Sequence, residues 1–211
     1  MIVPQGIEDY AEAHTTPATD LLEELSEETR ATLRDPGMLT GNVQGRLLEM
    51  LVFASGAKRV LELGTYSGFG ALSMAAGLPE DGHIDTCEVD ERHAEVARRY
   101  IARSPYADRI TVHLGPALET VERLEGDFDF VYVDADKSGY PRYYEALVPR
   151  LSARGLMALD NMLRHGSVID ESDDSEGARS IRELNDRIAS DPRVTAVLLP
   201  MRDGITLVRR N

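Results

Sequence analysis

The chain has 211 residues, of which 42% are hydrophobic and 28% are charged, and its formal net charge is −14. This composition is typical of one globular α/β domain and argues against a disordered chain. The acidic balance disfavours a nucleic-acid partner, because a negative surface repels phosphate backbones. No apolar stretch approaches the roughly 18 residues that a membrane helix needs, and the first residues do not resemble a signal peptide. We therefore expect a cytoplasmic protein with no membrane partner.

Residues 1–45 differ in pattern from the rest of the chain. Thr16 and Pro17 have the form of an N-cap followed by proline in the first helical turn, and the leucines after them fall on or near one helical face. Residues 35–37, Asp-Pro-Gly, would end that helix. We predict N-terminal helices that lie as a cap against the main part of a single domain, residues 1–211.

From residue 46 onward, short apolar strands alternate with helices, which is typical of a mostly parallel sheet covered by helices on both faces. The linker 200–204 is short enough for a hairpin and predicts that the last strand is antiparallel. The predicted strands are 59–63, 83–89, 109–114, 128–133, 156–159, 194–199 and 205–209. The predicted helices are 47–53, 71–76, 91–103, 117–124, 143–151 and 176–190.

A glycine-rich turn joins the first of these strands to a helix. Its sequence, Glu-Leu-Gly-Thr-Tyr-Ser-Gly-Phe-Gly over residues 62–70, lets the backbone bend sharply and approach a ligand. The helix that follows favours a carboxylate or phosphate at its N-terminus. The glycine spacing is not that of the dinucleotide fingerprint. Glu88, at the end of the next strand, could bind both hydroxyls of a ribose. These features fit a site for NAD or S-adenosylmethionine (SAM), or a structural turn.

Polar side chains follow two further strands at their carboxyl ends. Asp134 comes directly after one strand, and Asp160 and Asn161 follow the next. Adjacent parallel strands would bring them to one edge of the sheet, where α/β proteins bind ligands. Two carboxylates and an amide oxygen suit Mg²⁺, with Ca²⁺ or Mn²⁺ as alternatives, although such residues also cap helices and turns. Lys137, one turn beyond Asp134, could accept a proton from a hydroxyl or pair with a neighbouring aspartate.

Three other features invite an interpretation. Cys87, the single cysteine, cannot form an internal disulfide and is predicted to be a small buried residue in a strand. His165 follows the Asp-Asn pair closely enough to line a pocket. The acidic segment 170–176 is either a solvated loop or a lid over the site.

These motifs together resemble the metal-dependent class I SAM O-methyltransferases, the family of catechol and caffeoyl-CoA O-methyltransferases and their small bacterial relatives. The resemblance runs from about residue 38 to residue 210, and the order and spacing of its segments are more specific than any one of them. The segments are VLELGTYSGFG at 60–70, GPA at 115–117, VDADKSGY at 133–140, LDN at 159–161 and DGITL at 203–207.

The resemblance implies a Rossmann-like, seven-stranded sheet with an antiparallel last strand, and a homodimer. It also implies that SAM is bound around the carboxyl ends of the first strands, by Thr40, Glu62, Gly64, Thr65, Tyr66, Gly70, Glu88, Ala117 and Asp134. Thr40 and the turn would hold the methionine part of SAM, with Glu62 near its amino group. Glu88 would bind the ribose, and Ala117 would lie by the adenine.

The family's metal ligands would correspond to Asp134, Asp160 and Asn161, and its catalytic base to Lys137. The chain departs from the family pattern at two positions that are expected to contact SAM and the acceptor. Gly70 stands where many relatives have Ser or Thr, so the resemblance implies the loss of one hydroxyl contact to the SAM carboxylate. Arg164 stands near the place of a common Trp, which predicts a more polar acceptor pocket.

We therefore predict a SAM- and metal-dependent O-methyltransferase acting on a small catechol-like acceptor with vicinal hydroxyls. The alternatives are a carrier-bound hydroxyacyl group, which Arg164 would suit if the acceptor is anionic, and tRNA hydroxyuridine, which the charge of −14 disfavours. An NAD-dependent dehydrogenase is disfavoured by the glycine spacing, and a SAM-binding protein without catalysis by the intact Lys137.

Overall fold

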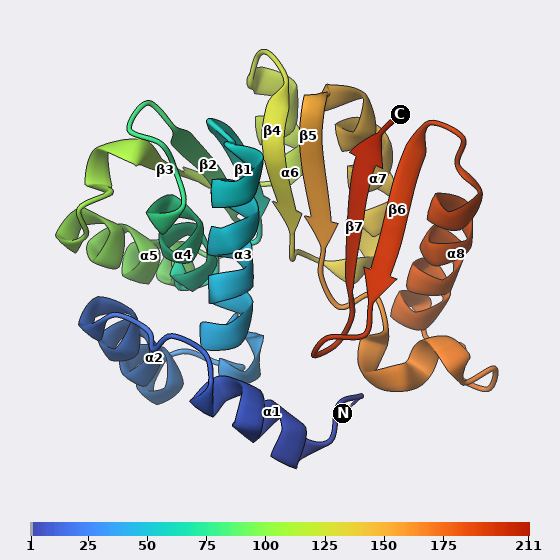
Figure 1. Ribbon diagram of the computed structural model, residues 1–211, viewed down its shortest axis with the longest axis horizontal. Helices are drawn as coiled ribbons and strands as arrows, with labels where there is room; N and C mark the ends of the chain where they lie inside the picture. Colours follow the sequence, from blue (N-terminus) through green and yellow to red (C-terminus); the bar gives the residue numbers. More distant parts are fainter. Residues whose placement is uncertain (1) are drawn as a thin grey trace.

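Seven strands form one sheet in the computed structural model, which describes residues 2–211 (Figure 1). The order across the sheet is β3-β2-β1-β4-β5-β7-β6. Strand β7 runs antiparallel to both of its neighbours, and the pairs on the β3–β5 side are parallel. The Rossmann-like fold and the antiparallel last strand are thus confirmed. The strands are β1 (Arg59–Leu63), β2 (His83–Glu88), β3 (Ile110–Leu114), β4 (Phe128–Val133), β5 (Leu151–Leu159), β6 (Val194–Leu199) and β7 (Ile205–Arg210).

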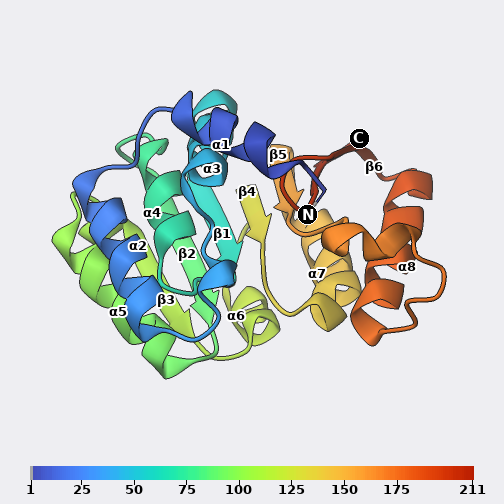
Figure 2. The ribbon, with the colours of Figure 1, turned by 90° about the horizontal axis from the view of Figure 1, so that it is seen from below.

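Helices cover the two faces of this sheet unequally (Figures 1 and 2). Helices α3 (Asn42–Ser55), α4 (Phe69–Ala76) and α5 (Glu91–Arg103) pack on one face, over the β1–β3 half. Helices α6 (Ala117–Arg123), α7 (Tyr140–Leu147) and α8 (Glu176–Ser190) cover the other face. The central strands β1 and β4 are buried on both sides, as strands of a covered parallel sheet should be. Within residues 2–211, no helix is long and apolar enough to cross a membrane.

The predicted N-terminal helices are present as α1 (Gln5–Ala13) and α2 (Asp20–Thr32). Both lie below the edge toward which the arrows of β4 and β5 point in Figure 1. Helix α2 begins after Thr19, so the predicted start at Thr16-Pro17 is wrong. The carbonyl groups of Thr16 and Pro17 accept hydrogen bonds from the side chain of Arg46 on α3, which holds this segment outside the helix.

Three other elements begin earlier in the chain than predicted. Strand β5 begins at Leu151, five residues before the predicted start, because Leu151 already pairs with Phe128 of β4, and residues 152–155 form an irregularity before the regular pairing resumes at Leu156. Helix α3 begins at Asn42 and helix α7 at Tyr140, both earlier than predicted. Tyr140 precedes Pro141, which suits the first turn of a helix.

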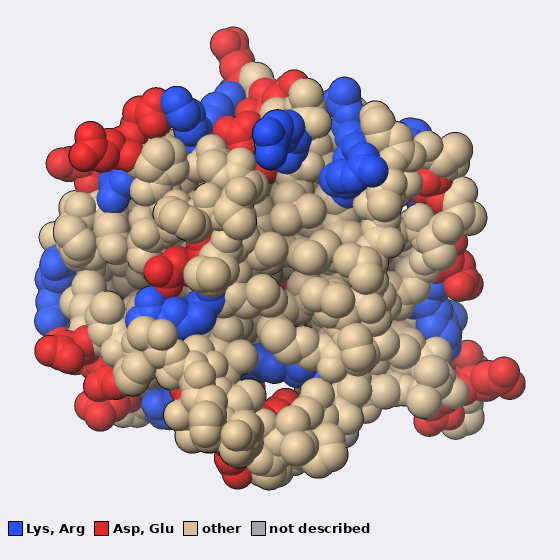
Figure 3. Space-filling model, viewed as in Figure 1, with Lys and Arg blue, Asp and Glu red and all other residues tan. Residues whose placement is uncertain are grey.

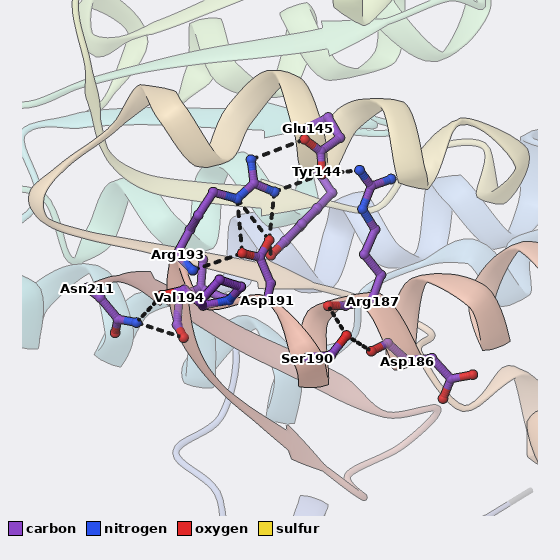
Figure 4. A network of polar contacts seen from close by, with 10 residues as sticks. Tyr144, Glu145, Asp186, Arg187, Ser190, Asp191, Arg193, Val194 and Asn211 are labelled. Atoms are coloured by element: carbon purple, nitrogen blue, oxygen red, sulfur yellow. Dashed lines mark hydrogen bonds and ion pairs between the residues drawn. The ribbon is translucent and has the colours of Figure 1, made fainter.

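A polar network connects α7 to the segment between α8 and β6 (Figure 4). Arg193 donates to Asp191, just after α8, and to Glu145 on α7 at 2.9 Å. The Tyr144 hydroxyl donates to the same Asp191 carboxylate at 2.9 Å. The Arg193 guanidinium holds the pKa of Asp191 well below its ordinary value. This network is structural, since none of these residues lines the cavity described next.

Candidate active site

A cavity of about 1350 Å³ opens at the carboxyl ends of the parallel strands. Figure 3 shows a hollow in the lower part of the molecule, between this edge of the sheet and the N-terminal helices, with acidic and basic atoms visible around it. Most of the predicted site residues line the cavity: Thr40, Gly64, Thr65, Tyr66, Glu88, Ala117, Asp134, Lys137, Asp160 and Asn161. Glu62 and Gly70 do not form part of its wall and lie behind it.

The turn after β1 is pressed against the loop after β4. Gly64 has φ +99°, and a Cβ atom there would overlap the backbone carbonyl oxygen of Asp134. The Asp134 N–H also donates to the Leu63 carbonyl at 2.8 Å. Only glycine allows this approach, so Gly64 brings the predicted SAM turn and the predicted metal loop into contact.

Glu62 is a buried carboxyl group behind the turn. Its Oε2 accepts a hydrogen bond from the Thr86 hydroxyl at 2.5 Å, and Thr86 in turn contacts the Thr65 hydroxyl at 2.5 Å. Burial, reinforced by the negative charges of Asp134 and Glu88, raises the pKa of Glu62 to about 8. A cation arriving beside this carboxyl group would favour its ionised form.

Gly70 makes room for that carboxyl group. A Cβ atom at Gly70 would overlap Glu62 Oε1 and would lie 3.6 Å from the Thr40 hydroxyl oxygen. Thr40 lines the cavity, so Glu62 lies directly behind this part of the wall. The absence of a side chain at Gly70, which the resemblance treats as a lost hydroxyl, here gives space to Glu62.

Glu88 is held in place by backbone N–H groups. Its carboxylate accepts hydrogen bonds from the N–H groups of Tyr66 at 2.7 Å, Val89 at 2.8 Å and Asp90 at 2.9 Å. Glu88 is buried at the cavity wall, beside the ring of His93. A carboxylate fixed in this way can present its remaining lone pairs to hydroxyl donors of a ligand.

The turn also contains a polar group that the sequence reasoning missed. The Ser67 hydroxyl is buried at the cavity wall and has no hydrogen-bond partner among residues 2–211. A buried hydroxyl without a partner is costly, and a polar ligand in the cavity would satisfy it.

Asp160 lies in a buried hydrogen-bond network at the end of β5. Its Oδ2 accepts from the Tyr132 hydroxyl at 2.8 Å and from Gln44 Nε2 at 2.5 Å, and its Oδ1 accepts from the Asn161 N–H at 2.7 Å. Burial and the nearby charge of Asp134 raise its pKa. The network therefore orients Asp160, while the electrostatic environment disfavours two bare carboxylates at this edge.

Gln44 and Tyr132 were not predicted as site residues. Gln44 is 2% exposed and is a polar residue on the buried face of α3, which was the available signal. Tyr132 lies within the strongly apolar strand β4, where nothing in the pattern distinguishes its hydroxyl from a packed ring.

Lys137 is anchored at two points beside this network. Its Nζ donates to Asp134 Oδ1 and to the Tyr140 hydroxyl, each at 2.8 Å. The Tyr140 hydroxyl lies 2.9 Å from the carbonyl oxygens of Val133 and Asp160 and donates toward them. The pairing of Lys137 with Asp134 thus exists, and the same side chain also lines the cavity.

The donor set at this edge suits a hard cation. Residues 2–211 contain no cluster of three or more His, Cys, Asp or Glu side chains arranged to hold a metal ion. The predicted set instead has two carboxylates and the Asn161 amide, all with oxygen donors. Burial and the charge of Asp134 raise the pKa of Asp160, and a bound cation would favour the ionised form of both carboxyl groups.

The remaining predicted features are more peripheral. His165 lines the cavity mouth, but its side chain is 81% exposed and its ring lies 3.4 Å from the Asp203 carboxylate. Cys87 is buried in β2 as predicted, and burial raises the pKa of its thiol to about 12. The segment 170–176 contributes no residue to the cavity wall, and its role as a lid stays a prediction.

Comparison with known proteins decides the family. A family model described as O-methyltransferase matches residues 12–211. The chain belongs to this family. The probable caffeoyl-CoA O-methyltransferase 2 of Dictyostelium discoideum is 34% identical over 211 residues, covering 97% of the chain and 91% of that protein. Caffeoyl-CoA O-methyltransferase 1 of Eucalyptus globulus is 36% identical, covering 82% of the chain and 75% of that protein.

Solved structures agree with this assignment. The O-methyltransferase of Bacillus cereus, in complex with S-adenosylhomocysteine (SAH), has a TM-score of 0.90 at 31% identity, covering 98% of the chain and 97% of that structure. An SAH-bound methyltransferase of Podospora anserina has a TM-score of 0.90 at 28% identity, covering 100% and 99%. The prediction of a SAM-dependent O-methyltransferase is confirmed, and the NAD-dependent dehydrogenase is set aside.

Proposed function

We propose that this O-methyltransferase uses a divalent metal ion and SAM to methylate one hydroxyl of a small acceptor with two neighbouring hydroxyls. One observation carries the proposal. One cavity is lined both by the turn at Gly64 and by the side chains of Asp134, Asp160, Asn161 and Lys137. Methyl transfer to a coordinated hydroxyl needs oxygen ligands for a metal, a base and a cofactor turn within one cavity, and these residues could supply all three. In this proposal residues 1–211 act as one catalytic domain; of these, Met1 lies outside the described residues.

SAM would lie along the carboxyl ends of β1, β2 and β3. The backbone of the turn at residues 64–66 and Thr40 would hold its methionine part, with Ser67 offering its free hydroxyl. Glu62, behind the wall at Gly70, would face the amino group. The fixed Glu88 carboxylate would accept the ribose hydroxyls, and Ala117 would contact the adenine.

Asp134, Asp160 and Asn161 would hold the metal, for which Mg²⁺ is the first candidate and Ca²⁺ or Mn²⁺ the alternatives. A cation bound there supplies Lewis-acid chemistry and a fixed position for the acceptor oxygens. Gln44 and Tyr132 would keep the Asp160 carboxylate oriented through their hydrogen bonds, as outer partners of metal ligands commonly do.

Lys137 would act as the base. Asp134 and Tyr140 fix its ammonium group from two sides, which leaves its third donor position for the cavity. In its neutral form the amine would accept the hydroxyl proton as the acceptor oxygen forms a bond to the methyl carbon of SAM. The carbon–sulfur bond breaks at the same time and SAH is released. Positioning in line would supply much of the rate.

The test is methyl transfer from labelled SAM to caffeic acid, first with Mg²⁺ and then with EDTA. We expect product with Mg²⁺ and loss of turnover with EDTA, restored when Mg²⁺ is added in excess. Turnover that EDTA does not change would contradict the metal role. Tight SAH binding by calorimetry without any methylation would retain the cofactor site and reject the acceptor.

A second candidate acceptor is a hydroxyaryl group carried as a thioester. The names of the two relatives above favour it, because one is called a caffeoyl-CoA O-methyltransferase and the other a probable one. A tRNA hydroxyuridine acceptor has no such support, and a net charge of −14 opposes it.

We also propose that the chain forms a homodimer. In Figures 1 and 2 no helix covers β5, β7 and β6 on the α3 side of the sheet, and the centre of this face in Figure 3 has few charged atoms. On α3, Met50 is 63% exposed and Phe53 is 73% exposed, while Val197 on β6 is 51% exposed. Two strongly acidic copies repel one another, so this neutral, apolar face is where they would meet most favourably.

Sedimentation velocity at micromolar concentration should give the mass of two chains. Phe53→Glu should shift the protein to the mass of one chain, because it buries a charge in the apolar contact. Glu27→Gln, on the exposed surface of α2, serves as a matched control that should stay dimeric. A single-chain mass for the unmodified protein would contradict the proposal.

A further inference from the structure

The segment that follows the predicted metal ligands has an unusual backbone. Asn161, Arg164 and His165 have φ values of 57°, 44° and 54°, in the left-handed region that residues with a Cβ rarely adopt. The strain is held by the β6–β7 hairpin. The N–H groups of Met162 and Leu163 donate to the carbonyl groups of Gly204 and Asp203, each at 2.9 Å. Strain that the surroundings maintain in this way is characteristic of functional positions.

This backbone places the Arg164 side chain against the first turn of α8. A Cβ atom at Gly177 would lie 2.9 Å from the guanidinium carbon, so a residue with no side chain at 177 makes room for the group. Arg164 is half-buried and lines the cavity together with Lys137 and Asn161. It thus lies beside α8 on the proposed acceptor side of the site.

The guanidinium group of Arg164 has no direct partner in the described part of the chain. Within residues 2–211 its guanidinium makes no hydrogen bond and no ion pair. Hydrogen bonds from Ser175, followed by the charges of Arg182 and Arg164, lower the pKa of Asp173, but Arg164 makes no ion pair with that carboxylate. A half-buried cation left in this state favours an anion from outside the protein.

Two other arginines line the cavity, and they differ in whether they have a partner in the protein. Arg202 donates to the Thr40 carbonyl and so has a structural partner. Arg142 on α7 lines the cavity, is exposed, and makes no hydrogen bond within the described chain. Arg142 is exposed to solvent, whereas Arg164 is half-buried against α8. Two unpaired guanidinium groups therefore border the cavity of a protein whose net charge is −14.

We propose that Arg164, assisted by Arg142, binds a negatively charged group of the acceptor, so that the enzyme selects acceptors with a carboxylate or a phosphate over neutral ones. The inference rests on the proposed function and adds the class of acceptor to it. Guanidinium groups bind both anions through paired, charge-assisted hydrogen bonds, which give selectivity as well as affinity.

The experiment compares three acceptors with the same vicinal hydroxyls: caffeic acid, its neutral amide, and its coenzyme A thioester. We expect kcat/KM for at least one of the two anionic acceptors to exceed that for the amide about 10- to 100-fold, mainly through KM. A preference for the acid identifies a carboxylate as the anion, and a preference for the thioester identifies the carrier phosphates. Arg164→Gln should bring the ratio of anionic to neutral acceptors close to one.

Two controls make the result specific. Arg164→Lys keeps the charge but not the paired donors, and should recover only part of the ratio. Arg98→Gln, on the exposed surface of α5, removes an arginine far from the cavity and should leave the ratio unchanged. Equal use of all three acceptors, or a ratio that Arg164→Gln does not alter, would overturn the inference while the proposed function stands. Methylation of none of them, with SAH still bound, would overturn both.

Discussion

Replacing Lys137 with methionine is expected to lower kcat at neutral pH by about 10²- to 10⁴-fold, the range that a positioned general base contributes. Methionine keeps the length of the stem but has no group that can accept the hydroxyl proton. The affinity for SAH should stay close to that of the unmodified protein, because the proposed contacts with SAH are made by other residues of the cavity, namely the turn at Gly64, Glu88 and Ala117. Stopped-assay kinetics with labelled SAM, combined with calorimetry of SAH, measure the two effects separately.

Two further observations would show that kcat falls because a general base has been removed. The activity of Lys137→Met should recover in part as the pH rises, since the acceptor hydroxyl then ionises in solution. Lys137→Arg should be nearly as impaired, because a guanidinium can keep the contact with Asp134 but does not lose a proton at accessible pH. An unchanged kcat for Lys137→Met at pH 7 would remove Lys137 from the mechanism.

Glu62 should couple cofactor binding to proton release. In the free protein, burial and the charges of Asp134 and Glu88 raise its pKa to about 8, so it is protonated near pH 6.5. If the amino group of SAH lies beside it, the cation favours the carboxylate and the bound state holds fewer protons than the free state. Raising the pH therefore favours binding, by up to about tenfold per unit, until pH approaches about 8.

Calorimetry of SAH at pH 6.5, in buffers of different ionisation enthalpy, should show the release of about one proton per ligand bound. Between pH 5.5 and 7.5 the affinity should rise by up to about 100-fold, a range in which the amino group of SAH stays charged. Glu62→Gln preserves the shape of the side chain and should give weaker, nearly pH-independent binding. Proton release that persists in this variant would place the titrating group elsewhere.

The sequence was most informative where chemistry requires a specific residue at a strand end. Asp134, Asp160 and Asn161 were predicted to meet at one edge of the sheet, and all three line one cavity. This succeeds because parallel neighbours share a carboxyl edge, so a position at the end of a strand is also a position in space.

The sequence could not reveal contacts made across the fold. Gln44 reaches Asp160 over 116 residues of separation, and periodicity carries no information about such a pair. The start of α2 was misplaced for the same reason. Thr16 and Pro17 have the local form of a helix start, but Arg46 on α3 uses their carbonyl groups. Local propensity is a weak prior where a tertiary contact competes with it.

The order of the strands in the sheet determines the point in synthesis at which the chain can become catalytically active. Strand β7 lies between β5 and β6 although it is made after both, so β6 has no partner in the sheet until β7 has left the ribosome. The same hairpin supplies the carbonyl groups that hold Met162 and Leu163 beside the predicted metal ligands. Domains fold as units during synthesis, and the sheet of this domain is complete only after β7 has been synthesised. A chain interrupted before residue 205 would lack the strand that supports the acceptor side of the site, so translation itself delays catalysis until the sheet is complete.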